Sequence, residues 1–279
     1  MAYKSILTVI SDPDVASSAL EEAIAITRAH DAHLEVIAVG VDRTQIGYYY
    51  AGAPVQFMEE ALEVARAEAA EAEKFVKGRL EKAGIRWSSE TAVAQLAGLN
   101  TLVAHRARYN DLAILPRPYC EGCGPEQEVI VESALFDGHA PVMIVPPQAE
   151  PRPDARRIVL GWNESAEALA AAKAALPLLK MAEIVSIAMV DPPRHGPDRS
   201  DPGGALSQYL VRHGVKVEIS ILAKTMPRVS DVLMRHVKDM NADLLVMGAY
   251  GHSRFREAIL GGATRYVMEQ AEFPVFMAH

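Results

Sequence analysis

The sequence predicts an α/β protein that consists of two repeated, doubly wound domains, each built on a five-stranded parallel sheet. Two observations support this fold class. Short apolar runs alternate with helical stretches, and the same order of elements occurs twice within the 279 residues. Strands that are separated by helices imply right-handed crossovers, which place helices on both faces of a parallel sheet.

The first strand of each half is a short apolar run that leads into a polar turn and an alanine-rich helix. The strands are expected at Ile6–Ile10 and Ile158–Trp162, and the helices at 15–29 and 166–179. The turns are rich in Asp, Asn and Ser, whose side chains accept hydrogen bonds from the amides at a helix start. Each half therefore begins with a strand–turn–helix unit.

The second strands, Leu34–Asp42 and Ile184–Asp191, are largely apolar, and both end in Val-Asp. Continuous apolar runs are typical of strands that are buried on both faces. A variable insert follows each of them. In the first half it contains the helical stretch Met58–Ala83, and in the second it is a Pro- and Gly-rich loop followed by a short helix that ends near His213.

The remaining elements also occur in pairs, and each half closes with an apolar strand that begins at proline. The pairs are third strands at Ile85–Ala92 and Val215–Leu222, helices at 99–108 and 229–240, fourth strands at Asn110–Leu115 and Ala242–Met247, and closing strands at Pro141–Val145 and Pro274–Ala278. A proline-rich stretch between the halves predicts an extended spacer. We therefore expect domains over residues 1–147 and 158–279, joined by a linker over residues 148–157.

The composition argues against several classes of function. The chain has 36 acidic and 28 basic residues, a net charge of -8, and it lacks a basic block of the kind that binds nucleic acid or anionic membranes. No segment reaches the roughly 20 apolar residues that cross a bilayer. Asp12 interrupts the N-terminus too early for the apolar core of a signal peptide. We expect a cytoplasmic protein with no nucleic-acid or membrane partner.

Glycines gather after the fourth strand of the second half. Gly248 and Gly251 lie where this strand ends, and Gly261 and Gly262 come immediately before a helical pattern. Ligands of open α/β sheets bind at the carboxyl ends of the strands. Glycines there permit positive φ angles and remove the Cβ atoms that would block the approach of a phosphate to backbone amides.

The start of the last helix offers groups that suit an anion. The amides of Gly261, Gly262 and Ala263 would join the positive end of the helix dipole, and Thr264 could add a hydroxyl. This pattern is neither a Walker A loop nor a dinucleotide G-x-G-x-x-G. Alternatively, the glycines only make a tight turn and a close contact between helix and strand.

The spacing Gly248-x2-Gly251-x9-Gly261 resembles the ATP-binding signature of the universal stress protein (UspA-like) family. The resemblance extends over the whole chain as a tandem pair and implies the adenine-nucleotide α-hydrolase-like fold twice. It also implies ATP or another adenine nucleotide as the ligand of the second half, with no metal firmly implied. Gly262 stands where the family has Ser or Thr, which leaves the binding of a triphosphate open.

Two further contacts follow from the resemblance. Asn163 stands where the family has an Asp near the ribose and base, and Val190 stands where the backbone of the family meets adenine. Family members commonly dimerise through their last strands. The resemblance therefore implies a homodimer or a pseudo-dimer within this chain.

The first half departs from the glycine pattern. Pro116 occupies the place of Gly248, and alignment of the closing strands places Glu128 and Val129 opposite Gly261 and Gly262. A carboxylate at that position would repel a phosphate. We expect that the first half has lost nucleotide binding.

Cys120 and Cys123 form a Cys-x2-Cys pair. A zinc site would need two more ligands, so it would have to be shared across a dimer. Thiol redox activity would need a cysteine at a helix N-terminus, and the neighbouring prolines argue against one. We expect two ordinary cysteines in an irregular loop.

Together these features predict a stress-response regulatory protein that binds an adenine nucleotide in its second half and is not an enzyme. One alternative is a ligand-free structural or interaction protein. Another is a weak nucleotide hydrolase, for which only Asp191 and Glu257 could serve as metal-holding carboxylates.

Overall fold

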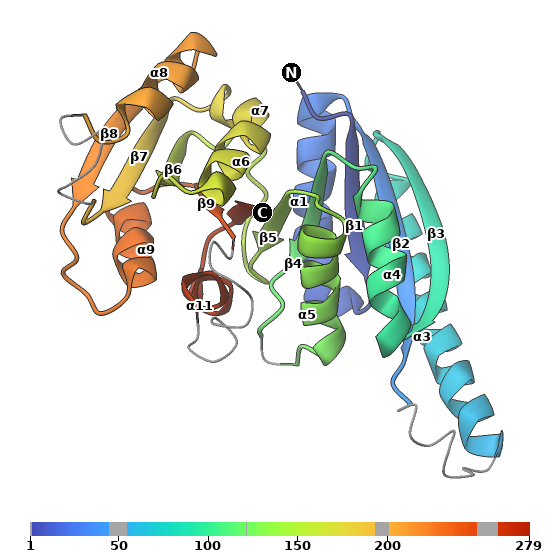
Figure 1. Cartoon of the computed structure of the whole chain (residues 1–279). Coiled ribbons are helices and arrows are strands. Elements are labelled where there is room, and N and C mark those ends of the chain that lie inside the picture. Colours follow the sequence, from blue (N-terminus) through green and yellow to red (C-terminus); the bar gives the residue numbers. More distant parts are fainter. Residues whose placement is uncertain (1, 45–54, 121, 193–200, 250–261) are drawn as a thin grey trace. The chain divides into compact units, whose positions relative to one another are not determined.

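A computed structural model of the chain describes residues 2–44, 55–120, 122–192, 201–249 and 262–279. The chain divides into two compact units, Tyr3–Ala140 and Pro141–His279. In each unit, helices cover a sheet whose strands are mostly parallel (Figure 1). The predicted α/β fold class is confirmed.

The N-terminal unit begins with the strand–turn–helix pattern that the sequence predicts. Its elements are β1 (Ser5–Ile10), α1 (Pro13–His30), β2 (His33–Asp42), α3 (Val55–Leu80), β3 (Arg86–Gln95), α4 (Leu96–Ala107), β4 (Leu112–Pro116), α5 (Pro125–Glu132) and the π-helical turn η1 (Ser133–Asp137). Its strands lie in the order β3-β2-β1-β4 and pair in parallel. The central strands β1 and β4 are almost entirely buried, as expected for continuous apolar runs.

The C-terminal unit repeats this plan. Its elements are β5 (Val142–Val145), β6 (Arg157–Gly161), α6 (Ala166–Ala174), α7 (Leu176–Leu179), β7 (Ile184–Val190), α8 (Gly204–Arg212), β8 (Val217–Leu222), α9 (Val229–Asp239), β9 (Leu244–Gly248), α11 (Ala263–Gln270) and β10 (Val275–Ala278). Its strands lie in the order β5-β10-β9-β6-β7-β8. All adjacent pairs are parallel except β5 and β10, which run antiparallel.

Some local features differ from the sequence-based expectations. The single helix expected over 166–179 is divided into α6 and α7, because Pro177 has no amide hydrogen for the carbonyl one turn earlier. The helix α5 and the turn η1 are additional to the predicted elements. Pro125 is the first residue of α5, where a missing amide hydrogen costs nothing.

The strand β5 closes the first sequence repeat but belongs to the C-terminal compact unit. There it pairs antiparallel with β10, with Val275 opposite Ile144 and Met277 opposite Val142. The closing strands of the two repeats are therefore neighbours. In the part of the chain that the structure describes, no helix combines the length and the apolar character that a membrane span requires.

Candidate functional site

A cavity of about 570 Å³ lies in the C-terminal unit, at the carboxyl ends of neighbouring parallel strands. The ends of β6, β7 and β9, the first residues of α11 and one side of α9 surround it. Its lining consists of Gly161, Trp162, Asn163, Glu164, Ser165, Glu167, Ala188, Met189, Val190, Asp191, Pro192, Val229, Leu233, Met247, Gly248, Ala263 and Thr264. This is where open α/β sheets bind their ligands.

One part of the lining is apolar. Met189 and Val190 come from β7, Met247 from β9 and Leu233 from α9, while the Trp162 indole follows β6. Such a surface suits a flat, weakly polar ring, because aromatic and aliphatic side chains gain by removing one another from water.

The turn after β6 is held by short-range hydrogen bonds. Asn163 Oδ1 accepts a hydrogen bond from the Ser165 amide at 3.2 Å, and Ser165 Oγ accepts one from the Ala168 amide at 3.1 Å. Ser165 is therefore the N-cap of α6. Between them, Glu164 has a φ of 63°, which turns the chain into the helix. The Asn163 side chain thus serves the turn while it lines the cavity.

Gly248 allows β9 and the start of α6 to approach closely. A Cβ atom at Gly248 would lie 2.5 Å from the Ala168 backbone nitrogen and 2.7 Å from the Glu167 carbonyl carbon. Real side chains do not tolerate such distances to backbone atoms. A close contact between helix and strand is an alternative reason that the sequence allows for glycines in this region. At Gly248 this reason applies, and it does not require a ligand.

The start of α11 faces the cavity. Gly262 is the N-cap and supplies no side-chain hydrogen bond to the helix amides. Ala263 is exposed, whereas Thr264 is only 3% exposed. The first amides of a helix have no acceptor within the helix, and the dipole places partial positive charge there. The cavity therefore has one wall suited to an anionic group.

The charged side chains of the lining are acidic. Glu164, Glu167 and Asp191 are carboxylates, and the described lining residues include no lysine or arginine. Carboxylates accept hydrogen bonds from sugar hydroxyls but repel phosphates. Among the described groups, the backbone amides at the start of α11 are thus the ones that would compensate the charge of a phosphate.

The structure brings most of the sequence-predicted site residues together. Asn163, Val190, Gly248, Ala263 and Thr264 line the cavity, and Gly262 adjoins it as the N-cap of α11. Gly251 and Gly261 lie outside the described residues, as does Glu257. The role of all these residues in binding stays a prediction.

Sequence reasoning missed the α9 side of the cavity, Val229 and Leu233. Their spacing of four residues places them on one helix face, but nothing in the sequence shows which cavity that face borders. Trp162, next to the predicted Asn163, could have been found by its position directly after a strand.

The corresponding corner of the N-terminal unit is occupied by its own side chains. Gln127 Nε2 donates a hydrogen bond to Ser11 Oγ at 2.8 Å, and Arg43 Nη2 lies 2.8 Å from Glu126 Oε1. Ser11 follows β1, Arg43 follows β2, and both partners belong to the first turn of α5. Glu128 lies in this turn too, so the expected carboxylate is present, and it is accompanied by the buried Glu126.

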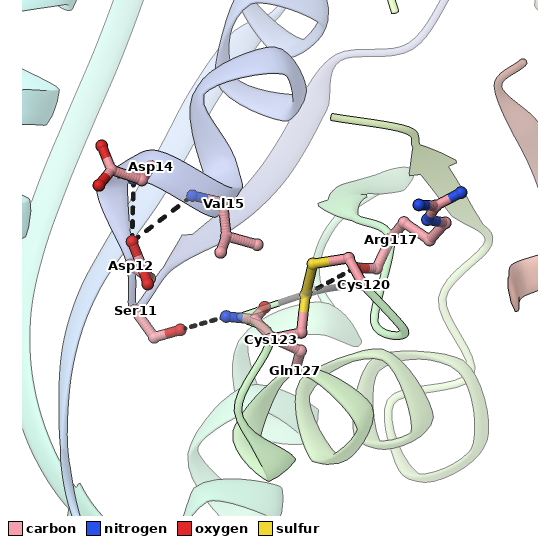
Figure 2. The surroundings of a disulfide bond; sticks show 8 residues. All are labelled: Ser11, Asp12, Asp14, Val15, Arg117, Cys120, Cys123 and Gln127. Atoms are coloured by element: carbon pink, nitrogen blue, oxygen red, sulfur yellow. Dashed lines mark hydrogen bonds between the residues drawn. A yellow bond between two sulfur atoms is a disulfide. The ribbon is translucent and has the colours of Figure 1, made fainter. Parts of the chain in front are cut away.

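The two cysteines lie in an irregular loop, as expected, but they are not two separate thiols. Cys120 and Cys123 form a disulfide with a Cα–Cα distance of 5.2 Å (Figure 2). From the sequence, the neighbouring prolines argue against a helix start near the cysteines. However, Pro125 is itself the first residue of α5, two residues after Cys123. Among the described residues, no group of three or more His, Cys, Asp or Glu side chains is arranged to hold a metal ion.

Comparison with known proteins gives a sequence match for the C-terminal half. Residues 155–279 match the sequence model of the Universal stress protein family. A universal stress protein of Synechocystis sp. is 33% identical over 72 residues, which are 26% of this chain and 24% of that protein. The chain thus matches only about a quarter of the length of this curated relative.

Solved structures resemble the whole chain. A universal stress protein from Archaeoglobus fulgidus has a TM-score of 0.71 at 16% identity, covering 98% of this chain and 95% of its own. A putative universal stress protein from Pseudomonas aeruginosa has a TM-score of 0.61 at 16% identity, covering 99% and 93%. At such low identity these likenesses establish the fold. Residues 155–279 thus resemble the universal stress protein family in sequence, and the whole length of the chain has the tandem form of that fold.

Proposed function

We propose that the protein is a non-enzymatic stress-response regulator whose C-terminal unit binds an adenine nucleotide. The observation that carries this proposal is the cavity at the carboxyl ends of β6, β7 and β9, which the start of α11 borders. A nucleotide has three parts, and the lining offers a suitable surface for each of them.

The adenine ring would lie against the apolar part of the lining, beside Met189, Val190 and Trp162. The ribose would face the polar rim, where Asn163 and Asp191 can accept hydrogen bonds from its hydroxyls. The phosphates would approach the first amides of α11, which follow Gly262. Bound nucleotide would stabilise the folded form of this unit by mass action. A partner protein would then respond to the difference between the bound and the free unit.

Catalysis is not part of the proposal. Phosphoryl transfer needs a metal held close to the phosphates and a group that positions the nucleophile. Asp191, a described lining residue, follows the end of β7. Its proposed role is to accept hydrogen bonds from the ribose, and this role requires no metal.

The test uses Ala263, an exposed residue at the first position of α11. Ala263→Asp places a negative charge where the phosphates would bind, yet an acidic residue in the first turn favours the helix, so folding is preserved. Calorimetric titration with ATP, ADP and AMP should give an affinity at least about tenfold lower than that of the parent.

Ala263→Asn is the matched control, because it has the shape of Asp without the charge. It should keep most of the parent affinity. Equal affinity of the Asp and Asn variants would place the phosphates elsewhere, and no heat from the parent with any nucleotide would favour a ligand-free interaction protein. Release of phosphate from ATP by the parent, lost in Ala263→Asp, would instead favour the hydrolase.

A further inference from the structure

The first turn of α5 closes a corner of the N-terminal unit at the carboxyl ends of β1 and β2. Gln127 reaches the buried Ser11 hydroxyl after β1. Glu126 reaches Arg43 after β2, and Arg43 also pairs with Glu68 of α3 at 2.8 Å. The hydrogen bond that Arg43 donates to Glu126 raises the pKa of the Arg43 guanidinium above its ordinary value. Three separate elements are thus joined through one helical turn.

The Glu126 carboxylate occupies the position of an anion at this helix start. Its side chain is 4% exposed and folds back over Gly124, the N-cap of α5, so that a Cβ atom there would displace the carboxylate. Its Oε2 atom is buried and has no hydrogen-bond partner among the described residues. A buried carboxylate oxygen in this state is costly, which makes the closed turn less stable than a fully hydrogen-bonded one.

The Cys120–Cys123 disulfide lies directly before this turn (Figure 2). Next to Cys120, the Tyr119 hydroxyl donates a hydrogen bond to Glu128 of α5 at 2.8 Å. Both cysteines are half-buried, and Gly122 between them is exposed. The pair therefore lies at the partly exposed surface of the unit and not in its core.

We propose that Cys120 and Cys123 form a thiol–disulfide redox site that controls how firmly the first turn of α5 is held over the corner. In the disulfide form, the loop between β4 and α5 is constrained directly before the start of the helix. In the dithiol form, this constraint is gone, and the turn opens more often.

The reaction is an exchange with a dithiol reductant. One thiolate of the reductant attacks a protein sulfur, which breaks the Cys120–Cys123 bond and leaves a mixed disulfide. The second thiol of the reductant then attacks the reductant sulfur in the mixed disulfide and releases the second protein cysteine. Two electrons and two protons pass to the protein, both cysteines become thiols, and the reductant becomes a disulfide.

The loop geometry suits both redox states. The Cys123 amide donates to the Cys120 carbonyl at 3.1 Å, and Gly122 has a φ of 83°, so the β-turn from Cys120 to Cys123 has a hydrogen bond of its own in either redox state. Cys123 Sγ lies 3.5 Å from the Arg117 carbonyl oxygen, an acceptor for the thiol hydrogen once the bond is reduced. Because the disulfide closes a very short loop, it contributes less to global stability than one that spans a long loop.

The chain has two cysteines, which makes the redox state simple to measure. Intact mass after alkylation should show no label on protein treated with glutathione disulfide and two labels after treatment with dithiothreitol. Amide hydrogen exchange over 126–130 should be at least about threefold faster in the reduced protein, whereas exchange in α11 should be equal in both states.

The double variant Cys120→Ser, Cys123→Ser is the matched control. Its exchange over 126–130 should equal that of the reduced parent and should not respond to dithiothreitol. Two alkylated cysteines in the parent after glutathione disulfide would overturn the proposal, because no disulfide would then form. Equal exchange of α5 in the oxidised and reduced parent would also overturn it.

Discussion

Gly248 and Gly161 end the neighbouring strands β9 and β6 and line the same cavity, yet they meet different surroundings. A Cβ atom at Gly248 would collide with the backbone of α6, whereas one at Gly161 would lie 3.3 Å from Leu233 Cδ1, the end of a flexible side chain. The requirement for glycine is therefore strict at Gly248 and mild at Gly161.

We predict that Gly248→Ala destabilises the protein by about 1–3 kcal/mol, because α6 must shift to accommodate the methyl group. The matched control Gly161→Ala should change the free energy of unfolding by less, since Leu233 can move. Urea denaturation measures both. A smaller effect at Gly248 than at Gly161 would contradict the role of close packing between α6 and β9.

At the scale of the element, α9 packs against the sheet through a partly buried polar contact. His236 Nε2 lies 3.1 Å from the Ser186 hydroxyl of β7, which is also 2.8 Å from Ser220 Oγ of β8. Burial lowers the pKa of the His236 imidazole, although Asp239 and Glu218 act in the opposite direction. The neutral imidazole is thus the form that fits this contact.

This shift predicts that stability falls with pH in the mildly acidic range. The pKa of His236 is lower in the folded state than the value of about 6.5 expected when unfolded, so below that pH the unfolded chain binds more protons. The free energy of unfolding should be greatest above about pH 6.5 and should decrease as the pH falls below it. His30, whose pKa is lowered by burial and by Lys4, adds a change of the same sign.

Urea denaturation between about pH 8 and about pH 5 checks this prediction. His236→Gln, which can keep a hydrogen bond to Ser186, should lose part of the pH dependence. The exposed His213→Gln should leave it unchanged. An identical slope in the parent and His236→Gln would contradict the assignment.

At the scale of the whole molecule, the closing strand β10 depends on a strand from the other sequence repeat. Its residues are all buried, with Phe276 fully so, and β5 covers one edge of it. The fragment 158–279 contains a complete sequence repeat but lacks β5. An uncovered apolar edge is a template for pairing with another chain.

We therefore predict that the fragment 158–279 self-associates or unfolds at a lower temperature than the fragment Pro141–His279. Light scattering gives the molar masses, and thermal unfolding gives the midpoints. The matched pair differs mainly by β5 and the segment that follows it. Equal masses and midpoints for the two fragments would contradict the importance of the β5–β10 pair.

Much of the candidate site could be predicted from the sequence, because local chemistry specifies it. Asn163 follows a strand in a capping turn, and Ala263 and Thr264 begin a helix after glycines, so their places at the carboxyl edge follow from the parallel sheet. Val229 and Leu233 could not be predicted, because the packing of α9 alone brings them to the cavity.

The sequence by itself determined the two α/β repeats and their strand–helix order, and it predicted the corner of the candidate site, since periodicity and turn residues act over a few neighbouring positions. Only the tertiary structure decided that β5 pairs with β10, that Cys120 bonds to Cys123 and that Glu126 and Gln127 fill the first corner. The strand pairing and the filled corner depend on which distant segments meet, and a contact across more than a hundred residues, such as Ser11 with Gln127, leaves no local pattern in the chain. The disulfide is local, but a Cys-x2-Cys spacing by itself does not distinguish a bonded pair from two free thiols.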